Sequence, residues 1–129
     1  MILLDASVLI PYLKTGSPTV EKILDSVNCG ICGVTRAEIL HGARTPQDAQ
    51  KLCSAIDELV QVQIHPDTWD HLGSHLALLR QRGLPIPFQD VLLATVAIEH
   101  DAELWSHDSH FRVIQGVLPQ LRLFVGPTE

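Results

Sequence analysis

Short apolar runs alternate with longer amphipathic segments along this chain, and this alternation constrains the fold most strongly. Residues 2–4 form an uninterrupted apolar run, typical of a strand covered on both faces. Segment 66–82 instead repeats apolar residues at helical spacing, namely Trp69, Leu72, Leu76 and Leu79. Strands that alternate with helices indicate a parallel sheet with helices on both sides. We therefore expect an α/β protein, a single three-layer α/β/α domain over residues 1–129 with a mainly parallel sheet of about five strands.

The pattern predicts strands at residues 2–4, 29–34, 60–64, 103–106 and 121–125. It predicts helices at residues 7–13, 18–27, 35–43, 45–59, 66–82 and 90–100. Two of these helices have clear start signals, because Ser17-Pro18 and Thr45-Pro46 each place a capping hydroxyl before a proline.

The composition suits a folded domain, with 46% hydrophobic and 19% charged residues. Asp5 interrupts the apolar N-terminus, which is unlike a secretion signal. The longest apolar stretch, residues 91–98, falls far short of the ~20 residues that a membrane-spanning helix needs. We expect a soluble, cytoplasmic protein with no membrane partner.

Cys29 and Cys32 have the spacing of a redox pair and require an explanation. A redox pair works at a helix N-terminus, where the helix dipole lowers the thiol pKa. Here both cysteines fall in an expected strand, on which residues three apart point to opposite faces. We therefore predict buried structural thiols.

The net charge of −6 disfavours broad electrostatic contact with nucleic acid, since the chain has only nine Lys and Arg residues. A nucleic acid would have to bind through a local patch and a bound cation. The candidates for phosphate contacts are Arg36, Arg44, Arg80, Arg82 and Arg112. For any one of them, a solvated position on the surface is the favoured interpretation.

Acidic residues follow three of the expected strands closely. Asp5, Glu38 and Asp108 should therefore share the carboxyl edge of the sheet, where ligands bind in such folds. Asp90 begins the helix that leads to the strand before Asp108. Each acid also has a simpler explanation: Asp5 and Asp90 as helix caps, Glu38 in a capping box with Thr35, and Asp108 as a loop residue.

Convergence of the four acids would be costly without a cation. Two carboxylates ~5 Å apart repel by roughly 3 kcal/mol at an effective dielectric constant of 20. A marginally stable domain would not keep several such pairs for capping alone. Oxygen clusters of this kind bind Mg²⁺ or Mn²⁺, which activate water in phosphodiester cleavage. The pattern therefore predicts a metal site.

Four segments in order resemble the motifs of PIN-domain nucleases. They are ILLDASVLI at 2–10, TRAEILHG at 35–42, DVLLATVAIEH at 90–100 and LWSHDSHF at 104–111. The resemblance covers nearly the whole chain, and the length resembles VapC-type toxins of toxin–antitoxin pairs.

This resemblance implies a Mg²⁺- or Mn²⁺-dependent endoribonuclease with Asp5, Glu38, Asp90 and Asp108 as the metal-binding and catalytic acids. It also implies polar support from Ser7 and Ser106, an RNA substrate, a homodimer, and a cognate antitoxin whose tail blocks the active-site groove. The chain departs from the pattern at His110, where many relatives carry a further acid. A fully occupied second metal site is therefore not implied.

Other interpretations remain open beside the toxin. One is an RNA-processing nuclease of the same family without an antitoxin, and another is a catalytically silent interaction module. A phospho-acceptor domain of receiver type fits less well, because the residues before Asp5 are apolar and no lysine follows Lys51.

His71 and His75 lie one helical turn apart and could share a zinc ion. The HExxH pattern, however, has Leu72 in place of its glutamate, which favours surface histidines. For Trp69 and Trp105 we expect positions in the core.

Overall fold

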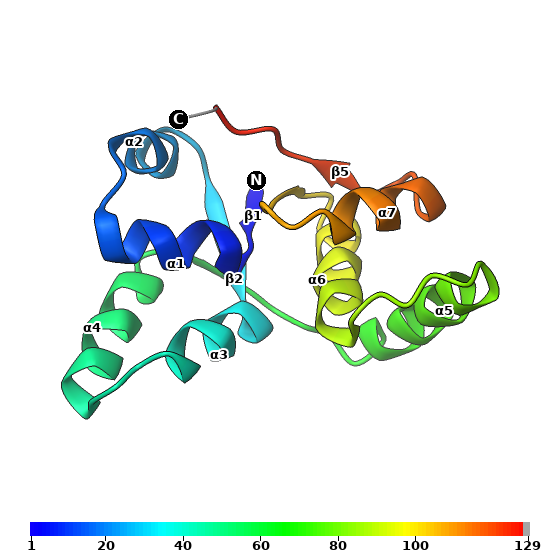
Figure 1. The fold of residues 1–129 in the computed structure, drawn as a ribbon, viewed down its shortest axis with the longest axis horizontal. Helices are drawn as coiled ribbons and strands as arrows, with labels where there is room; N and C mark the ends of the chain where they lie inside the picture. Colours follow the sequence, from blue (N-terminus) through cyan, green and yellow to red (C-terminus); the bar gives the residue numbers. More distant parts are fainter. Residues whose placement is uncertain (128–129) are drawn as a thin grey trace.

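The computed structural model contains a five-stranded sheet in the order β3-β2-β1-β4-β5, with every neighbouring pair parallel (Figure 1). The strands are β1 (Ile2–Leu4), β2 (Cys29–Cys32), β3 (Val60–Val62), β4 (Glu103–Trp105) and β5 (Arg122–Leu123). The structure describes residues 1–127, so the last two positions of the expected domain lie outside the described residues. β1 lies at the centre of the sheet. β2 and β3 follow on one side of it, and β4 and β5 follow on the other.

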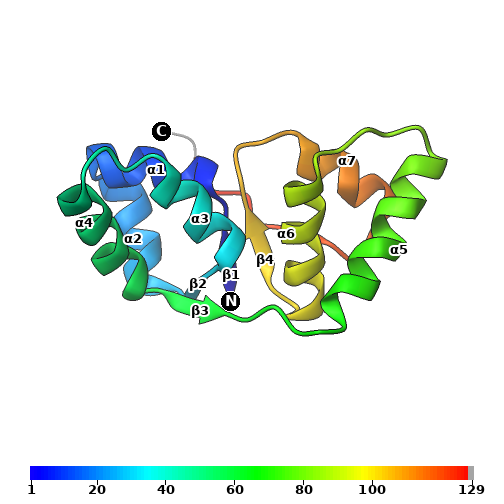
Figure 2. The same ribbon diagram turned by 90° about the horizontal axis from the view of Figure 1, so that it is seen from below.

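Two groups of helices cover the sheet, and Figure 2 shows one group on each side of the strands. The first group comprises α1 (Ala6–Thr15), α2 (Pro18–Ser26), α3 (Gly33–His41) and α4 (Pro46–Asp57). The second comprises α5 (Thr68–Gln81), α6 (Phe88–Glu99) and α7 (His110–Val117). The three-layer α/β/α prediction is confirmed. None of the helices within residues 1–127 is both long and apolar enough to cross a membrane.

The strands divide the buried residues into two clusters by simple alternation. Ile2 and Leu4 pack with α1–α4, whereas Leu3 between them packs with α5–α7. Cys29 belongs to the first cluster and Cys32 to the second, and both are free and buried. Burial raises the pKa of both thiols. The prediction of divergent structural cysteines is therefore confirmed.

The predicted helix starts at Ser17 and Thr45 are also confirmed. The Ser17 hydroxyl accepts a hydrogen bond from the Val20 N–H, and the Thr45 hydroxyl accepts one from the Asp48 N–H. A proline occupies the first turn of each helix. α1 is capped at its C-terminus by Gly16, whose φ of 66° is a left-handed conformation that glycine adopts without strain.

α3 begins at Gly33, two residues before the predicted start. The expected strand through Val34 is too long, because β2 pairs with β3 only up to Cys32 opposite Val62. Beyond this point the backbone has no strand partner, so its hydrogen bonds are formed within a helix. Val34 still packs into the core, which explains why the apolar pattern resembled a longer strand.

α7 is absent from the sequence-based expectation. The helix has only eight residues, its N-cap Ser109 makes no side-chain cap, and Gly116 lies within it. The available signal is the helical spacing of Phe111, Ile114 and Leu118, which are all buried.

The expected core position of Trp69 is wrong, since 51% of this residue is exposed. Leu72 and Leu79 lie on the buried stripe of α5, whereas Trp69 is turned about 60° away from Leu72 at 100° per residue. Trp69 therefore lies at the margin of the stripe. Trp105 is only 3% exposed, as predicted.

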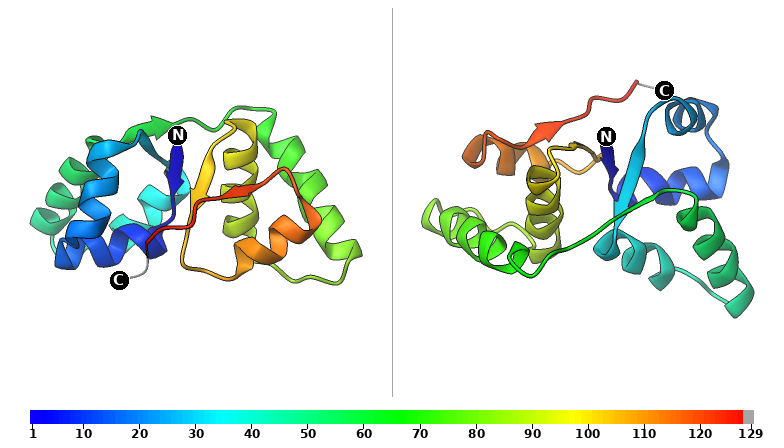
Figure 3. Two further views of the ribbon diagram at one scale, coloured as in Figure 1. Left: turned by 90° about the horizontal axis from the view of Figure 1, so that it is seen from above. Right: turned by 180° about the vertical axis from the view of Figure 1, so that it is seen from behind.

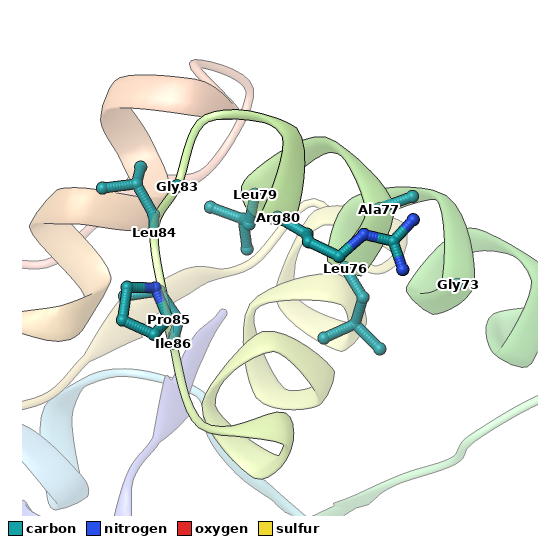
Figure 4. Close-up of a pocket in the computed structure, with 9 residues that line it drawn as sticks. All are labelled: Gly73, Leu76, Ala77, Leu79, Arg80, Gly83, Leu84, Pro85 and Ile86. Carbon is teal, nitrogen blue, oxygen red and sulfur yellow. The ribbon is translucent and has the colours of Figure 1, made fainter.

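The chain after β5 crosses from the side of α7 towards α2, as the two views of Figure 3 show. An apolar hollow lies between the end of α5 and the loop that follows it (Figure 4). Leu76, Leu84 and Ile86 are among its lining residues, and Arg80 is the charged one. The hollow contains no acidic side chain, so it is separate from the acidic residues considered next.

Candidate active site

The carboxyl ends of β1 and β4 meet at the centre of the sheet. Asp5 follows β1 directly, and its backbone N–H donates a 3.0 Å hydrogen bond to the Trp105 carbonyl at the end of β4. Ser106 and Asp108 lie in the loop after β4. This is the point at which the strand order reverses, and in open α/β sheets it is the usual position of a ligand site.

Asp5 is 7% exposed and is held by two hydroxyl groups. Ser7 Oγ and Ser106 Oγ each donate a 2.7 Å hydrogen bond to Asp5 Oδ2. The hydroxyls in turn accept hydrogen bonds from the backbone N–H groups of His107 (3.0 Å) and Asp108 (2.9 Å). Because each hydroxyl has one proton, the 3.1 Å approach of the two hydroxyl oxygens is a contact only. Within residues 1–127 no hydrogen bond reaches Asp5 Oδ1, which stays available to a ligand.

The capping explanations for Asp5 and Glu38 are wrong. Asp5 occupies the N-cap position of α1, but its side chain makes no cap hydrogen bond. Glu38 cannot belong to a capping box with Thr35, because α3 already begins at Gly33. Among residues 1–127 the buried Thr35 hydroxyl has no hydrogen-bond partner. Asp90 lies in the first turn of α6 without capping it, where the helix dipole favours its negative charge.

His110 joins two of the acids. Its Nδ1 lies 2.8 Å from Asp90 Oδ2 and 3.2 Å from Asp108 Oδ1. Its backbone N–H donates a 2.9 Å hydrogen bond to Asp108 Oδ1, which fixes the start of α7 on the loop. One ligand atom from each of the three residues lies within 4.8 Å of the others. Helix α6, the loop after β4 and helix α7 thus contribute one potential metal ligand each.

Asp5 and Glu38 lie outside this tight group but within electrostatic range of it. Burial raises the pKa of Glu38, and the charges of Asp5 and Asp90 raise it further. Burial also raises the pKa of Asp90; the hydrogen bond from His110 opposes this, and the charges of Asp108 and Asp5 add to it. The structure therefore brings the four predicted acids together. Not every pair of carboxylates, however, is as close as the ~5 Å assumed from the sequence.

The pattern of the PIN domain family matches residues 2–117. The chain belongs to the PIN domain family. Several solved structures have the same fold. VapBC2 from Rickettsia felis, bound to a promoter DNA fragment, has a TM-score of 0.82 at 22% identity, covering 98% of this chain and 100% of that one.

VapBC-1 from Haemophilus influenzae has a TM-score of 0.76 at 22% identity, over 96% of this chain and 97% of that one. VapC20 from Mycobacterium tuberculosis, described as a sarcin-ricin loop cleaving toxin, has a TM-score of 0.71 at 14% identity, over 98% and 100%. No curated protein matches the sequence of this PIN domain.

The arginines of this PIN domain have different surroundings. Arg36 pairs with Asp57 at 2.8 Å, so its charge is already compensated. Arg80 borders the apolar hollow of α5. Arg112 lines a second hollow, between β4 and α7, together with Ser106 and Asp108. Arg112 therefore lies in the same hollow as Asp108, beside the acidic group.

The two histidines on α5 do not form a zinc site. His71 Nδ1 pairs with Glu99 at 3.1 Å, whereas His75 Nδ1 lies 2.8 Å from Thr95 Oγ1. The Thr95 hydroxyl donates its proton to the Val91 carbonyl, so His75 must be the donor in this contact. The group of potential metal ligands found within residues 1–127 of the PIN domain does not include either histidine.

Proposed function

We propose that this PIN domain is a metal-dependent endoribonuclease and the toxin of a type II toxin–antitoxin pair. The observation that carries the proposal is the meeting of Asp5, Asp90 and Asp108 at the centre of the sheet edge, from elements far apart in the chain. Its structural neighbours support it, since they include VapBC complexes and a toxin described as cleaving the sarcin-ricin loop.

The donor atoms of the site fit a divalent cation. Asp90 and Asp108 offer carboxylate oxygens beside the imidazole of His110, and Asp5 Oδ1 is free of hydrogen bonds within the described residues. We assign Asp5, Glu38, Asp90 and Asp108 as ligands of Mg²⁺ or Mn²⁺. When bound, the cation supplies activation of water and stabilisation of the departing oxygen.

The side chains of this protein supply positioning and proton transfer. Ser7 and Ser106 hold the Asp5 carboxylate in one orientation before substrate arrives, which avoids the cost of ordering it later. Glu38 is more exposed than Asp5 and, besides its place in the ligand set, would accept a proton from the attacking water. Arg112 would contact a phosphate that flanks the scissile bond.

The proposal includes three partners: an RNA substrate, a second copy of the chain in a homodimer, and a cognate antitoxin in the cytoplasm. With a net charge of −6, the protein would bind RNA through local contacts and the cation. Such binding suits a target recognised by its shape, as in a structured loop.

The proposed function can be tested by incubating purified protein with total cellular RNA in the presence of Mg²⁺, Mn²⁺ or EDTA. We expect cleavage with either ion, none with EDTA, and none for Asp5→Asn. Asp70→Asn, which changes an acid in the first turn of α5, is the matched control and should cleave normally. Mapping RNA 5′ ends after brief induction of wild type and Asp5→Ala would identify the target. Intact RNA in every condition would remove the assignment.

A silent interaction module is the second candidate, because the imidazole of His110 already contacts both Asp90 and Asp108. A module of this kind need not bind metal, so calorimetry with Mn²⁺ on wild type and Asp90→Asn separates the two candidates. An RNA-processing nuclease without an antitoxin is distinguished by the absence of a short antitoxin gene next to this one.

A further inference from the structure

His110 is the residue at which this chain departs from the acidic motif, and the structure places it between two of the proposed ligands. We propose that His110 Nδ1 is itself a direct ligand of the cation, and that this nitrogen makes the site selective for Mn²⁺ over Mg²⁺. This inference rests on the proposed metal site and names the class of ion that it takes.

The spacing of the three ligand atoms suits one shared ion. Neighbouring ligands of an octahedral ion at about 2.1 Å are separated by about 3.0 Å. His110 Nδ1 lies 2.8 Å from Asp90 Oδ2 and 3.2 Å from Asp108 Oδ1. The three ligand atoms all lie within 4.8 Å of one another. The two distances from His110 Nδ1 are thus close to the spacing of neighbouring ligands, and the three residues lie near enough for one ion to contact all of them after a small adjustment of their side chains.

The backbone holds this arrangement in place. The His110 N–H donates to Asp108 Oδ1, so the residue that presents the imidazole also orients the neighbouring carboxylate. Asp90 is only 17% exposed at its side chain, whereas the His110 side chain is 41% exposed. An ion can thus approach from the solvent side without unfolding the site.

The nitrogen changes which ion the site prefers. Mg²⁺ is bound mainly by carboxylates, substrate phosphates and the waters that it releases reluctantly. Imidazole nitrogen is a better ligand for first-row divalent transition ions than for Mg²⁺, and Mn²⁺ is the member of that series that shares the preference of Mg²⁺ for carboxylate oxygens. Two carboxylates and one imidazole therefore favour Mn²⁺ relative to a site with oxygen ligands only.

The alternative role for His110 is a fixed ion-pair partner, in which Nδ1 continues to donate to the two carboxylates and never contacts the ion. Pulsed EPR of bound Mn²⁺ separates the two roles, because a directly bound imidazole nitrogen produces a ¹⁴N modulation that a remote one does not. The wild-type protein with one equivalent of Mn²⁺ is the sample.

We expect the ¹⁴N signal in wild type, its loss in both His110→Asp and His110→Gln, and its retention in His71→Gln. His71 is the matched control, because it also pairs with a carboxylate, Glu99, but lies outside the group of potential metal ligands found within residues 1–127. Calorimetry should show that His110→Asp lowers the ratio of Mn²⁺ to Mg²⁺ affinity by about tenfold or more, since even supporting residues of metal sites change affinity by that factor.

A wild-type Mn²⁺ complex without the ¹⁴N signal overturns the inference, and this result needs no variant to fold. A signal that persists in His110→Gln, or an affinity ratio unchanged in His110→Asp, overturns it too. Failure of the proposed function is a different result: Mn²⁺-loaded protein with the nitrogen signal that leaves RNA intact. RNA cleavage by a complex without the signal would keep the nuclease and remove His110 as a ligand.

Discussion

The Ser106 hydroxyl donates a 2.7 Å hydrogen bond to Asp5 Oδ2, although 101 residues separate the two in the chain. Ser7 makes the matching bond to the same oxygen from the start of α1. The loop after β4 and the end of β1 are therefore joined at the candidate active site by hydrogen bonds from hydroxyl groups to a carboxylate, and not by an ion pair. The predictions below begin with this pair.

Ser106→Ala should lower RNA cleavage and Mn²⁺ affinity by roughly 10- to 100-fold, the usual cost of removing a hydrogen bond that orients a metal ligand. Cleavage assays and calorimetry measure the two effects. Ser26→Ala is the matched control, since its hydroxyl donates to a helix carbonyl on α2. Unchanged cleavage in Ser106→Ala would show that Ser7 alone orients Asp5.

Glu38→Gln should stabilise the metal-free protein at pH 7.5. The raised pKa of Glu38 means that the folded state binds more protons than the unfolded state, from about pH 4.3 up through the folded pKa. Stability therefore falls as pH rises through this window, and the neutral glutamine escapes the loss. We expect a gain of roughly 0.5 kcal/mol, kept small by solvent screening.

Chemical denaturation at pH 7.5 and pH 4 measures the effect of Glu38→Gln, which should shrink at the lower pH. Glu21→Gln, an acid in the first turn of α2, serves as the control. The prediction fails if Glu38→Gln is the less stable protein at pH 7.5 without metal.

His75 should make the protein sensitive to mild acid. Its pKa is lowered, first by burial and then by His71, with Glu99 acting in the opposite direction. The unfolded state then binds more protons than the folded state below about pH 6.5, so stability falls as pH drops through that value. Unfolding of His75→Gln should depend less on pH between 7.5 and 5.5 than that of wild type. His41→Gln, at the exposed end of α3, should behave as wild type.

The thiols should react unequally. Cys29 and Cys32 are buried with raised pKa values, whereas Cys53 on α4 is partly accessible. A colorimetric thiol reagent should therefore modify Cys53 in the native protein and all three cysteines after denaturation. Oxidation should give no Cys29–Cys32 disulfide, because the two side chains face opposite sides of the sheet.

Periodicity in the sequence predicts the layers well, because the three inner strands bury both faces and each helix buries one. The apolar run of β1 and the proline starts of α2 and α4 are local signals of this kind, and all three are confirmed. Where a strand ends depends on its partner, which local patterns do not contain. The prediction of a strand at Val34 is therefore wrong. β3 ends at Val62, opposite Cys32, so it offers no partner to a longer β2.

The four acids could be brought together from the sequence because parallel strands end at a common edge. Their spacing could not be predicted, since it depends on where α6 and α7 begin. The predicted start of the Asp90 helix was two residues late, and α7 was not predicted at all. The position of His110 beside Asp90 follows from that missing helix.

The pairing of β1 with β4 also determines when, during synthesis of the chain, the acids of the candidate site can come together. A ribosome-bound fragment that stops before Glu103 already carries Asp5, Glu38 and Asp90, but one side of β1 has no neighbour. The loop with Ser106 and Asp108 is then still to be synthesised. The four acids can therefore come together only after the chain has been made through Asp108, which lies beyond β4.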